Sequence, residues 1–296
     1  MQARSDKAYR RLIARFFDFY SRALLNPQWG EQVAFAPDNT LKISMVCQGL
    51  DKEQVRAVWQ PFFAWLQDAP DDYKIVDILG AGAMEARGWW TADKNHSLVR
   101  DLRAGAPAHH AWWDGDQGQV GAYLHGYDSL WLPAALLREA GGRRLTEAVF
   151  AASRHKELGF HMNKGLAGAP AAALAAARDT ATNPAVLAAF ALVIIADGEG
   201  PAYPGLPGAA VNREAARKDA RAIDRAAAEL RRIAPAAGSY VSESNYFNAG
   251  WQRAYWGEHY ARLRAIKHHY DPGGLFFAYH GVGSEDWSAD GFTQLR

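Results

Sequence analysis

The chain reads Gly238-Ser239-Tyr240-Val241-Ser242-Glu243-Ser244-Asn245-Tyr246-Phe247-Asn248-Ala249-Gly250-Trp251-Gln252 and, farther on, Trp256-Gly257, Tyr260-Ala261-Arg262-Leu263, Ile266-Lys267 and Tyr270-Asp271-Pro272-Gly273-Gly274-Leu275-Phe276. This stretch is the most informative part of the sequence. Its opening predicts a strand in which Tyr240 and Ser242 share one face while Val241 and Glu243 share the other. An aromatic-rich turn follows, then a helix over 258–269 that places Leu263, Ile266 and Tyr270 inward. The run Asp271-Pro272-Gly273-Gly274 ends that helix.

Composition sets broad limits on the rest of the chain. The 296 residues are 49% hydrophobic and 22% charged, with 33 Lys and Arg against 32 Asp and Glu. A net charge near zero gives no electrostatic reason to expect nucleic acid or an acidic membrane surface as a partner. No apolar run approaches the roughly 20 residues of a membrane span. The single cysteine, Cys47, excludes an internal disulfide. Residues 1–18 lack the apolar core of a signal peptide, so we take a cytoplasmic location as the default expectation.

Hydrophobic periodicity predicts the elements before residue 80. Helical spacing covers 9–24 and 52–67, and strand patterns cover 32–35, 41–47 and 73–79. The order β-β-α-β with short links favours an α+β fold, in which an antiparallel sheet is flanked by helices.

The second half of the chain is less uniform, and residues 86–130 give no clear pattern. The expected helices lie at 131–140, 145–153, 171–178 and 212–233, a strand at 158–163, a strand or helix end at 190–196, and a loop at 198–208. These elements suggest a first domain over 1–237 and a separate C-terminal segment over 238–296.

A glycine motif and two histidine pairs resemble nucleotide-binding and metal-binding motifs, but the residues around them do not support either function. Gly80-Ala81-Gly82 follows the strand at 73–79, but Glu85 stands where the third glycine of a dinucleotide fingerprint belongs. The pairs His109-His110 and His268-His269 point their side chains in different directions, so neither is a ready chelate. We therefore expect no metal site.

The strand at 158–163 has a polar side. Strand alternation places Phe160 and Met162 on one face and His161 and Asn163 on the other. Gly165 and Gly168 end the strand and permit a close backbone approach. His161 and Asn163 are either a polar wall that faces a ligand or ordinary half-buried polar groups, and the sequence alone leaves both open.

The C-terminal motif resembles the corresponding segment of berberine-bridge-enzyme-like FAD-linked oxidoreductases, in the vanillyl-alcohol-oxidase superfamily. Four other stretches resemble bacterial members of that family: Asn26–Glu31, Ser129–Pro133, Asn163–Ala169 and His280–Trp287. The chain differs at Ser242 and His259, where many relatives carry Asn. Nothing in residues 1–40 resembles the family's N-terminal FAD-binding domain. The resemblance thus implies the substrate-binding domain of the fold plus the C-terminal segment that packs on an FAD domain, which we expect to be missing here or to be a separate chain.

The chemistry that the resemblance implies is oxidase-type hydride transfer from a small organic or sugar alcohol to N5 of FAD. In this interpretation His161, Asn163 and Tyr240 are the candidate catalytic residues. The candidate flavin-binding residues are Tyr240, Ser242, Glu243, His259 and Tyr260. His161 and Tyr240 should then open onto one common hollow. The sequence names neither the substrate nor the mode of flavin attachment.

Two other interpretations stay open. The chain could be a catalytically inactive fragment or interaction module that holds no flavin. It could also be a ligand- or sugar-binding domain that uses some of its 11 tryptophans as stacking surfaces. Flavin binding separates the first interpretation from both alternatives.

Overall fold

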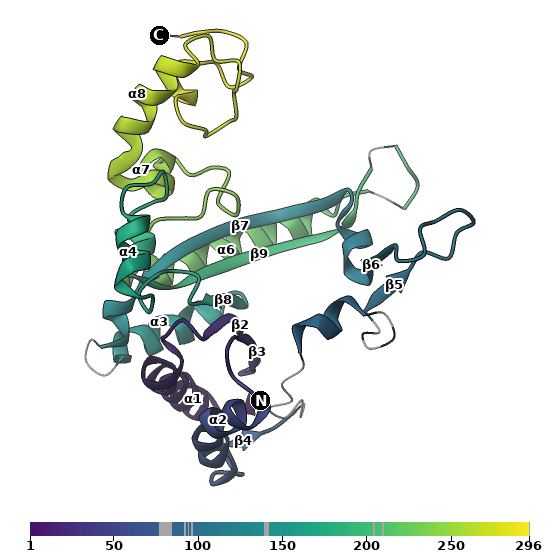
Figure 1. Cartoon of the computed structure of the whole chain (residues 1–296), viewed down its shortest axis with the longest axis vertical. Coiled ribbons are helices and arrows are strands. Elements are labelled where there is room, and N and C mark those ends of the chain that lie inside the picture. Colours follow the sequence, from purple (N-terminus) through teal and green to yellow (C-terminus); the bar gives the residue numbers. More distant parts are fainter. Residues whose placement is uncertain are drawn as a thin grey trace.

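A computed structural model describes residues 1–76, 85–91, 93, 95, 97–138, 142–203, 205–208 and 210–295. Its centre is a five-stranded sheet in which every neighbouring pair is antiparallel, in the order β3-β2-β8-β9-β7 (Figure 1). The strands are β2 Trp29–Phe35, β3 Leu41–Cys47, β7 Ala122–Pro133, β8 Leu158–Met162 and β9 Ala189–Pro201. The α+β fold with an antiparallel sheet is therefore confirmed.

One layer of helices covers one face of this sheet. Its members are α1 Asp6–Phe19, which continues as the π-helix η1 Tyr20–Leu24, α2 Lys52–Gln67, α3 Arg143–Ser153 and α6 Arg213–Ile233. Phe16 and Phe17 of α1 pack on Phe35 of β2, and Phe17 also reaches Phe160 of β8. These rings are buried in one continuous core that extends to Ile223 of α6. We call this side of the sheet the inner face and the opposite side the outer face.

The helices expected from the sequence form in part because side chains close to their N-termini hydrogen-bond the free backbone amides there. Ser5 accepts a hydrogen bond from the backbone amide of Ala8 at the start of α1. Asp51 and Gln54 form a reciprocal capping box at the start of α2. Asn212 caps α6, as expected, by accepting from the amide of Ala215.

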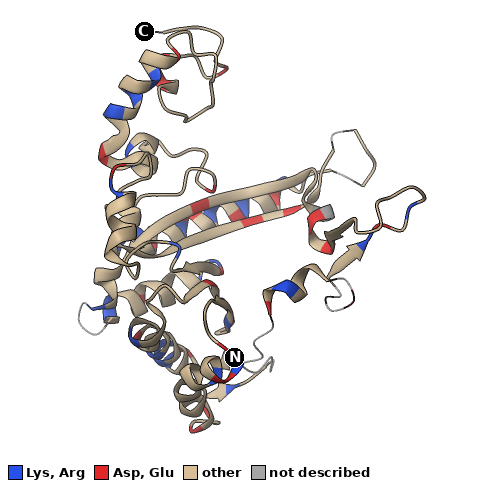
Figure 2. Cartoon of the chain, viewed as in Figure 1, with Lys and Arg blue, Asp and Glu red and all other residues tan. Residues whose placement is uncertain are grey.

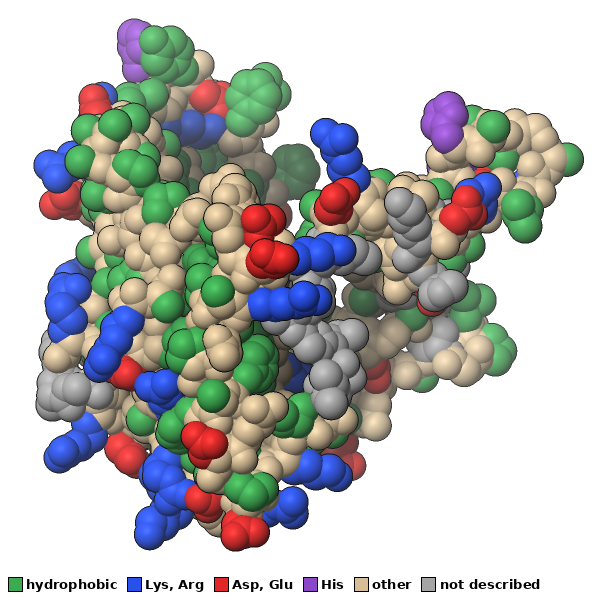
Figure 3. Space-filling view, turned by 60° about the horizontal axis from the view of Figure 1, so that its bottom comes forward, with side chains coloured by type: hydrophobic (Ala, Val, Ile, Leu, Met, Phe, Trp, Pro, Cys, Tyr) green, Lys and Arg blue, Asp and Glu red, His purple; other side chains and the backbone are tan. Residues whose placement is uncertain are grey.

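Strands β7 and β9 are long and extend beyond the rest of the sheet, and α6 runs along them (Figure 1). Smaller elements lie beyond and below this ribbon: the pair β5 Leu98–Arg100 and β6 Ala111–Trp113, the pair β1 Gln2–Ala3 and β4 Tyr73–Lys74, and the 3-10 turns η2 Ala86–Trp90 and η3 Asp114–Gln119. On the face shown in Figure 3, charged side chains of both signs are interspersed. This mixture agrees with the near-zero net charge.

The C-terminal residues stand at one end of the molecule, away from the helix layer (Figures 1 and 2). They form α7 Trp251–Trp256, η6 Gly257–His259, α8 Tyr260–Tyr270 and η7 Ser284–Asp286. The short helices α4 Ala171–Ala177 and α5 Ala185–Ala188 connect β8 to β9. None of the helices in the described residues combines the length and apolar composition that crossing a bilayer requires.

The structure corrects four expectations. The helix expected over 131–140 is instead the end of β7 followed by the 3-10 turn η4 Ala134–Leu137, because Leu130 and Leu132 alternate into the core as a strand requires. Of the strand expected over 73–79, residues 73–76 are described and only β4 Tyr73–Lys74 is a strand; residues 77–79 and the Gly-Ala-Gly motif after them lie outside the described residues. Strand β9 continues to Pro201 and takes up the start of the expected loop. In α8, Ile266 is 43% exposed and Tyr270 80% exposed, so these side chains do not point inward.

Candidate active site

A row of side chains crosses the outer face at the level of His161. The register pairs Ser44 with Gln32, Gln32 with His161, His161 with Leu192, and Leu192 with Trp131. Residues directly opposite each other in antiparallel strands point to the same side of the sheet. The row is polar and exposed at Ser44 and Gln32, half-buried at His161, and buried and apolar at Leu192 and Trp131.

His161 has one ionic partner at this surface. Its Nδ1 lies 3.1 Å from Oε2 of Glu31 in β2, and the side chain of His161 is 20% exposed. Nζ of Lys164 lies 3.6 Å from the other oxygen of the same carboxylate. The alternation expected along 158–162 is confirmed, since Leu158, Phe160 and Met162 are buried while His161 is on the outer face.

Asn163 does not share that face, which corrects the expectation from alternation. Strand β8 ends at Met162, and Asn163 has a left-handed backbone with φ 55°. Its side-chain oxygen Oδ1 accepts from the hydroxyl of Tyr20 at 2.8 Å. Its side-chain nitrogen Nδ2 donates to the backbone carbonyls of Leu24 and Trp29, each at 2.8 Å. These bonds tie the end of η1 to the start of β2, so the side chain is already engaged within the protein. The catalytic role of Asn163 stays a prediction.

The loop after Asn163 makes the close approach that its glycines predict. A Cβ atom at Gly165 would overlap the carbonyl of Ala189. At Gly168 it would lie 3.0 Å from the backbone of Leu25. This segment then packs Leu166 and Val186 against Leu192 and Trp131, which covers the apolar end of the outer face.

The C-terminal segment reaches the outer face along the free edge of β7. The amide of Trp131 donates to the carbonyl of Gly238 at 2.9 Å, and the amide of Tyr240 donates to Oγ of Ser129 at 3.0 Å. The ring of Tyr240 meets the ring of Trp131 edge-on, with centroids 6.4 Å apart. His161 and Trp131 are two strand spacings apart, roughly 10 Å. Tyr240 and His161 therefore flank the same face from opposite sides.

The expected strand over 240–243 is wrong, because the chain turns back on itself there. Tyr240 pairs with Glu243 in an isolated bridge, so the alternation of Tyr240 and Ser242 does not exist. Glu243 accepts a hydrogen bond from the hydroxyl of Tyr127 at 3.1 Å. Burial and the neighbouring Glu243 carboxylate raise the pKa of Tyr127 to about 12. Ser242 is exposed beside this pair.

The other two candidate flavin contacts, His259 and Tyr260, lie at the start of α8. Nδ1 of His259 donates to the carbonyl of Thr182 at 3.2 Å. The hydroxyl of Tyr260 donates to Glu285 and accepts from the amide of Gly283, and burial followed by the Glu285 carboxylate raises its pKa. Both side chains therefore serve contacts within the protein. Whether any of the five residues touches flavin stays a prediction.

Two cavities lie elsewhere, so the expected hollow shared by His161 and Tyr240 is not one of them. The first encloses about 250 Å³ and is lined by Asp128, Arg231, Ala237, Ser239, Asn245, Asn248 and Ala254. The second encloses about 280 Å³ and is lined by Arg264, Lys267, His268, Asp271, Pro272, Gly283, Asp286, Trp287 and Gln294. Instead, Tyr240 is 37% exposed at the edge of an open surface.

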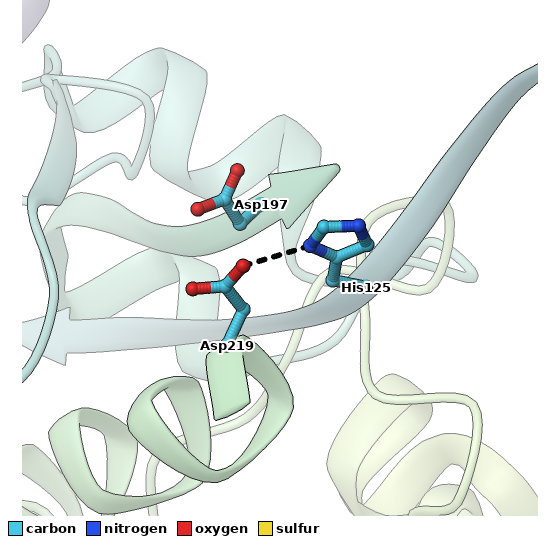
Figure 4. Close-up of side chains that lie close together, drawn as sticks. All are labelled: His125, Asp197 and Asp219. Atoms are coloured by element: carbon cyan, nitrogen blue, oxygen red, sulfur yellow. Dashed lines mark hydrogen bonds and ion pairs between the residues drawn. The ribbon is translucent and has the colours of Figure 1, made fainter. Parts of the chain in front are cut away.

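One group of side chains has the composition of a metal site. Among the described residues, His125, Asp197 and Asp219 place three ligand atoms within 4.8 Å of one another (Figure 4). However, Nζ of Lys156 binds both carboxylates, at 3.1 Å from Asp219. His125 hydrogen-bonds the other oxygen of Asp219 at 2.8 Å, and this bond, with help from Lys156, lowers the pKa of Asp219. The lysine already supplies the cation that such carboxylates would need, so we assign no metal here.

Comparison with known proteins adds a family for the C-terminal segment. The family model described as berberine and berberine like matches residues 238–283. These residues form a berberine-like segment. It begins at Gly238, where a Cβ atom would overlap the side chain of Asn183. The wider division at 237/238 into two domains stays a prediction.

Curated relatives match the chain over short stretches. The flavin-dependent oxygenase ucdF of Aspergillus ustus is 48% identical over 61 residues, which are 21% of this chain and 11% of that protein. The VAO-type flavoprotein oxidase VAO615 of Thermothelomyces thermophilus is 36% identical over 87 residues, 28% of this chain and 15% of that protein. The chain thus matches only a small part of the length of these relatives.

Solved structures extend the likeness to nearly the whole fold. The VAO-type flavoprotein MtVAO615 from Myceliophthora thermophila C1 superposes with a TM-score of 0.60 at 18% identity, over 97% of this chain and 46% of that one. A carbohydrate oxidase from Microdochium nivale gives 0.53 at 14% identity, over 95% and 53%. The chain therefore has the VAO-type fold around its berberine-like segment and spans about half the length of these structures.

Sequence reasoning missed Glu31 and Trp131 as parts of this surface. The sequence pattern predicts a helix at Trp131, so it cannot indicate the face of the sheet on which this side chain lies. Glu31 meets His161 across 130 positions of sequence, and no local pattern indicates that contact.

Proposed function

We propose that the chain forms the substrate-facing part of an FAD-linked oxidoreductase of oxidase type, which oxidises a small organic or sugar alcohol. It would act with an FAD-binding unit, either in a longer protein or in a separate chain. The observation that supports this most is the outer face, where His161 of the sheet and Tyr240 of the berberine-like segment flank one surface. The flavin-linked names of the curated relatives support the same chemistry.

The residues present suit the ring of a flavin better than its phosphates. A flat ring needs apolar contacts with polar groups at its rim. Here the partly exposed ring of Tyr240 and the half-buried His161 supply the surface groups, and Leu192 and Trp131 lie buried beneath them. A pyrophosphate needs a cradle of backbone amides at a helix start. The one Gly-Ala-Gly motif of the sequence lies outside the described residues. We therefore assign ring contacts to this chain and phosphate contacts to the FAD-binding unit.

Bound FAD would supply the two-electron acceptor, at N5 of its ring. His161 would take the proton of the substrate hydroxyl, since a half-buried imidazole can serve as a general base near neutral pH. The phenol of Tyr240 would orient that hydroxyl from the opposite side. Leu166 and Val186, packed over Leu192, would keep water away from the apolar end of the surface.

The exposed side chains of the C-terminal segment give the FAD-binding unit a place to dock. Several large apolar residues there are more than half exposed: Tyr246, Phe247, Tyr270, Leu275, Phe276, Phe292 and Leu295. Such a concentration is unusual for a surface that faces water alone. We propose that this surface is covered when the flavin site is complete.

Complementation tests the proposal. The purified chain is mixed with FAD and with the isolated FAD-binding domain of a VAO-type relative, and binding is followed by quenching of flavin fluorescence. Alcohol- or oligosaccharide-dependent oxygen uptake is then measured. We expect quenching and uptake in the mixture, with uptake lost in His161→Ala and kept in His109→Ala, a histidine on the exposed loop between β5 and β6.

The same experiment can refute the proposal. A chain that neither quenches flavin fluorescence nor binds the FAD-binding domain is an interaction module without flavin. Uptake that survives in His161→Ala removes His161 from the chemistry. Binding without uptake on any alcohol leaves the fold assignment intact and overturns the catalytic role.

A further inference from the structure

We infer that Glu31 is a positioning residue that fixes the tautomer of His161 and directs its Nε2 lone pair outward. The inference rests on the proposed function for its chemical meaning, but the contact itself can be tested without flavin. It begins with the backbone of β2. Glu31 has φ 70°, in the left-handed region that residues other than glycine rarely adopt within a strand.

This backbone takes Glu31 out of the alternation of its strand. Trp29, Val33 and Phe35 are buried on the inner face, and regular alternation would place Glu31 with them. Instead its carboxylate reaches His161 on the outer face and remains 37% exposed. The Glu31 carboxylate thereby stays out of the core and contacts the imidazole of His161. Strained backbone of this kind is common where a functional group must be aimed.

The carboxylate decides which nitrogen of His161 carries the proton. An ionised carboxylate can only accept hydrogen bonds, so the 3.1 Å contact requires that Nδ1 is the donor. In the neutral imidazole Nε2 is then left with its lone pair. None of the described residues forms a hydrogen bond with Nε2. The nitrogen is free to receive a proton from a substrate.

The lone pair on Nε2 completes the proposed oxidation. Nε2 would take the hydroxyl proton of the alcohol, and bound oxidised FAD would supply the acceptor for the hydride and its two electrons as the alcohol becomes a carbonyl compound. His161 becomes an imidazolium, and Glu31 stabilises the charge through Nδ1. Without Glu31, the imidazole would favour a proton on Nε2 and present a donor where the reaction needs an acceptor.

Nitrogen-15 NMR of the imidazole rings tests the contact directly. Spectra of the labelled full chain at alkaline pH, where an imidazole is neutral, report which nitrogen is protonated, and His161→Asn assigns the signal. We expect the Nδ1–H form in the wild type and a shift to Nε2–H in Glu31→Gly. Glycine adopts the observed φ readily, so this variant should fold. Asn39→Gly, at φ 66° in the turn before β3, is the matched backbone control and should leave His161 unchanged.

The outcomes separate this inference from the proposed function. An Nε2–H signal in the wild type, or an unchanged signal in Glu31→Gly, overturns the role of Glu31. If the complemented oxidase is active, Glu31→Gly should lower kcat within the range of about 10²–10⁴-fold that general base catalysis contributes, with little change in KM. A wild-type Nδ1–H signal without any oxidase activity overturns the proposed function and leaves the positioning of His161 standing.

Discussion

Asn163 offers the sharpest test of whether a polar group near the outer face is structural. Its amide makes three hydrogen bonds of 2.8 Å, to Tyr20, Leu24 and Trp29. Together these bonds hold the π-helix at the end of α1 against the first residue of β2. Its backbone, at φ 55°, is one that asparagine tolerates better than most residues.

Two substitutions separate these contributions. Asn163→Gly removes the three hydrogen bonds but keeps a relaxed backbone, and at about 0.5–1.5 kcal/mol for each bond we expect a loss of about 2–4 kcal/mol in unfolding free energy. Asn163→Ala removes the same bonds and places a Cβ in the left-handed region. That strain adds about 1–2 kcal/mol. Alanine should therefore be the more destabilising change, although it is the larger side chain.

Urea unfolding followed by circular dichroism measures both values, and Asn39→Gly against Asn39→Ala calibrates the backbone effect in an exposed turn. If Asn163→Gly is within about 0.5 kcal/mol of the wild type, below the net value of one hydrogen bond, the structural role is refuted. A stable Asn163→Gly that also abolished oxidase activity would favour the catalytic role predicted from the sequence. A destabilised variant with proportionate loss of activity supports the network.

Three further predictions concern stability, pH and surface. Asp128→Asn should destabilise the protein by about 2–4 kcal/mol in urea unfolding, because the buried Asp128 carboxylate accepts two 2.7 Å bonds from Arg231, which remains partly exposed; a loss under about 0.5 kcal/mol would contradict this. The hydrogen bond from His125 lowers the pKa of Asp219 in the folded protein. Ionised Asp219 therefore adds to the free energy of unfolding above the pKa of an unfolded aspartate, and this stabilisation is lost as the pH falls below about 4. Asp219→Asn should flatten the acid side of the stability profile, and an unchanged slope would refute it. Without the FAD-binding unit, the exposed rings of the proposed docking surface should make the chain self-associate. Phe276→Asp should reduce that association in light scattering, because Phe276 belongs to this surface; undiminished association would locate the associating surface elsewhere.

The sequence predicts those parts of the fold that local periodicity encodes. The helix at 52–67 is found with the same bounds, and the helix expected over 212–233 begins one residue later, because their caps and apolar stripes lie within the segments themselves. The strand at 41–47 is also found as expected. In the two helices the buried residues recur on one side with the helical period, and in the strand burial alternates over residues 41–45.

Prediction fails where a long-range contact overrides the local pattern. Residues 240–243 alternate like a strand, yet the amide of Tyr240 bonds Ser129 and the chain turns back to bring Glu243 to Tyr127. The sequence pattern extends the alternation of β8 to Asn163, but its side-chain amide hydrogen-bonds the carbonyl of Leu24 at the end of η1. Glu31 gives no signal, because the partner that explains its backbone lies on another strand.

The contacts of the berberine-like segment bear on how the proposed site would be completed. The segment is fastened at its start, where Gly238 accepts from Trp131 and Ser239 bonds both Ser129 and the carbonyl of Ala254. These bonds cover the free edge of β7, which would otherwise remain open to pairing with another chain. Beyond α7 the attachment is weaker: α8 has no fully buried residue, and its contacts with the rest of the fold are polar ones, from His259 to Thr182 and from Arg262 to Asp179. A helix without a fully buried residue gains little from packing in its own chain, so its aromatic surface gains most from a unit that covers it. The anchored start places Tyr240 at the outer face, and the uncovered remainder is where we propose that the FAD-binding unit docks.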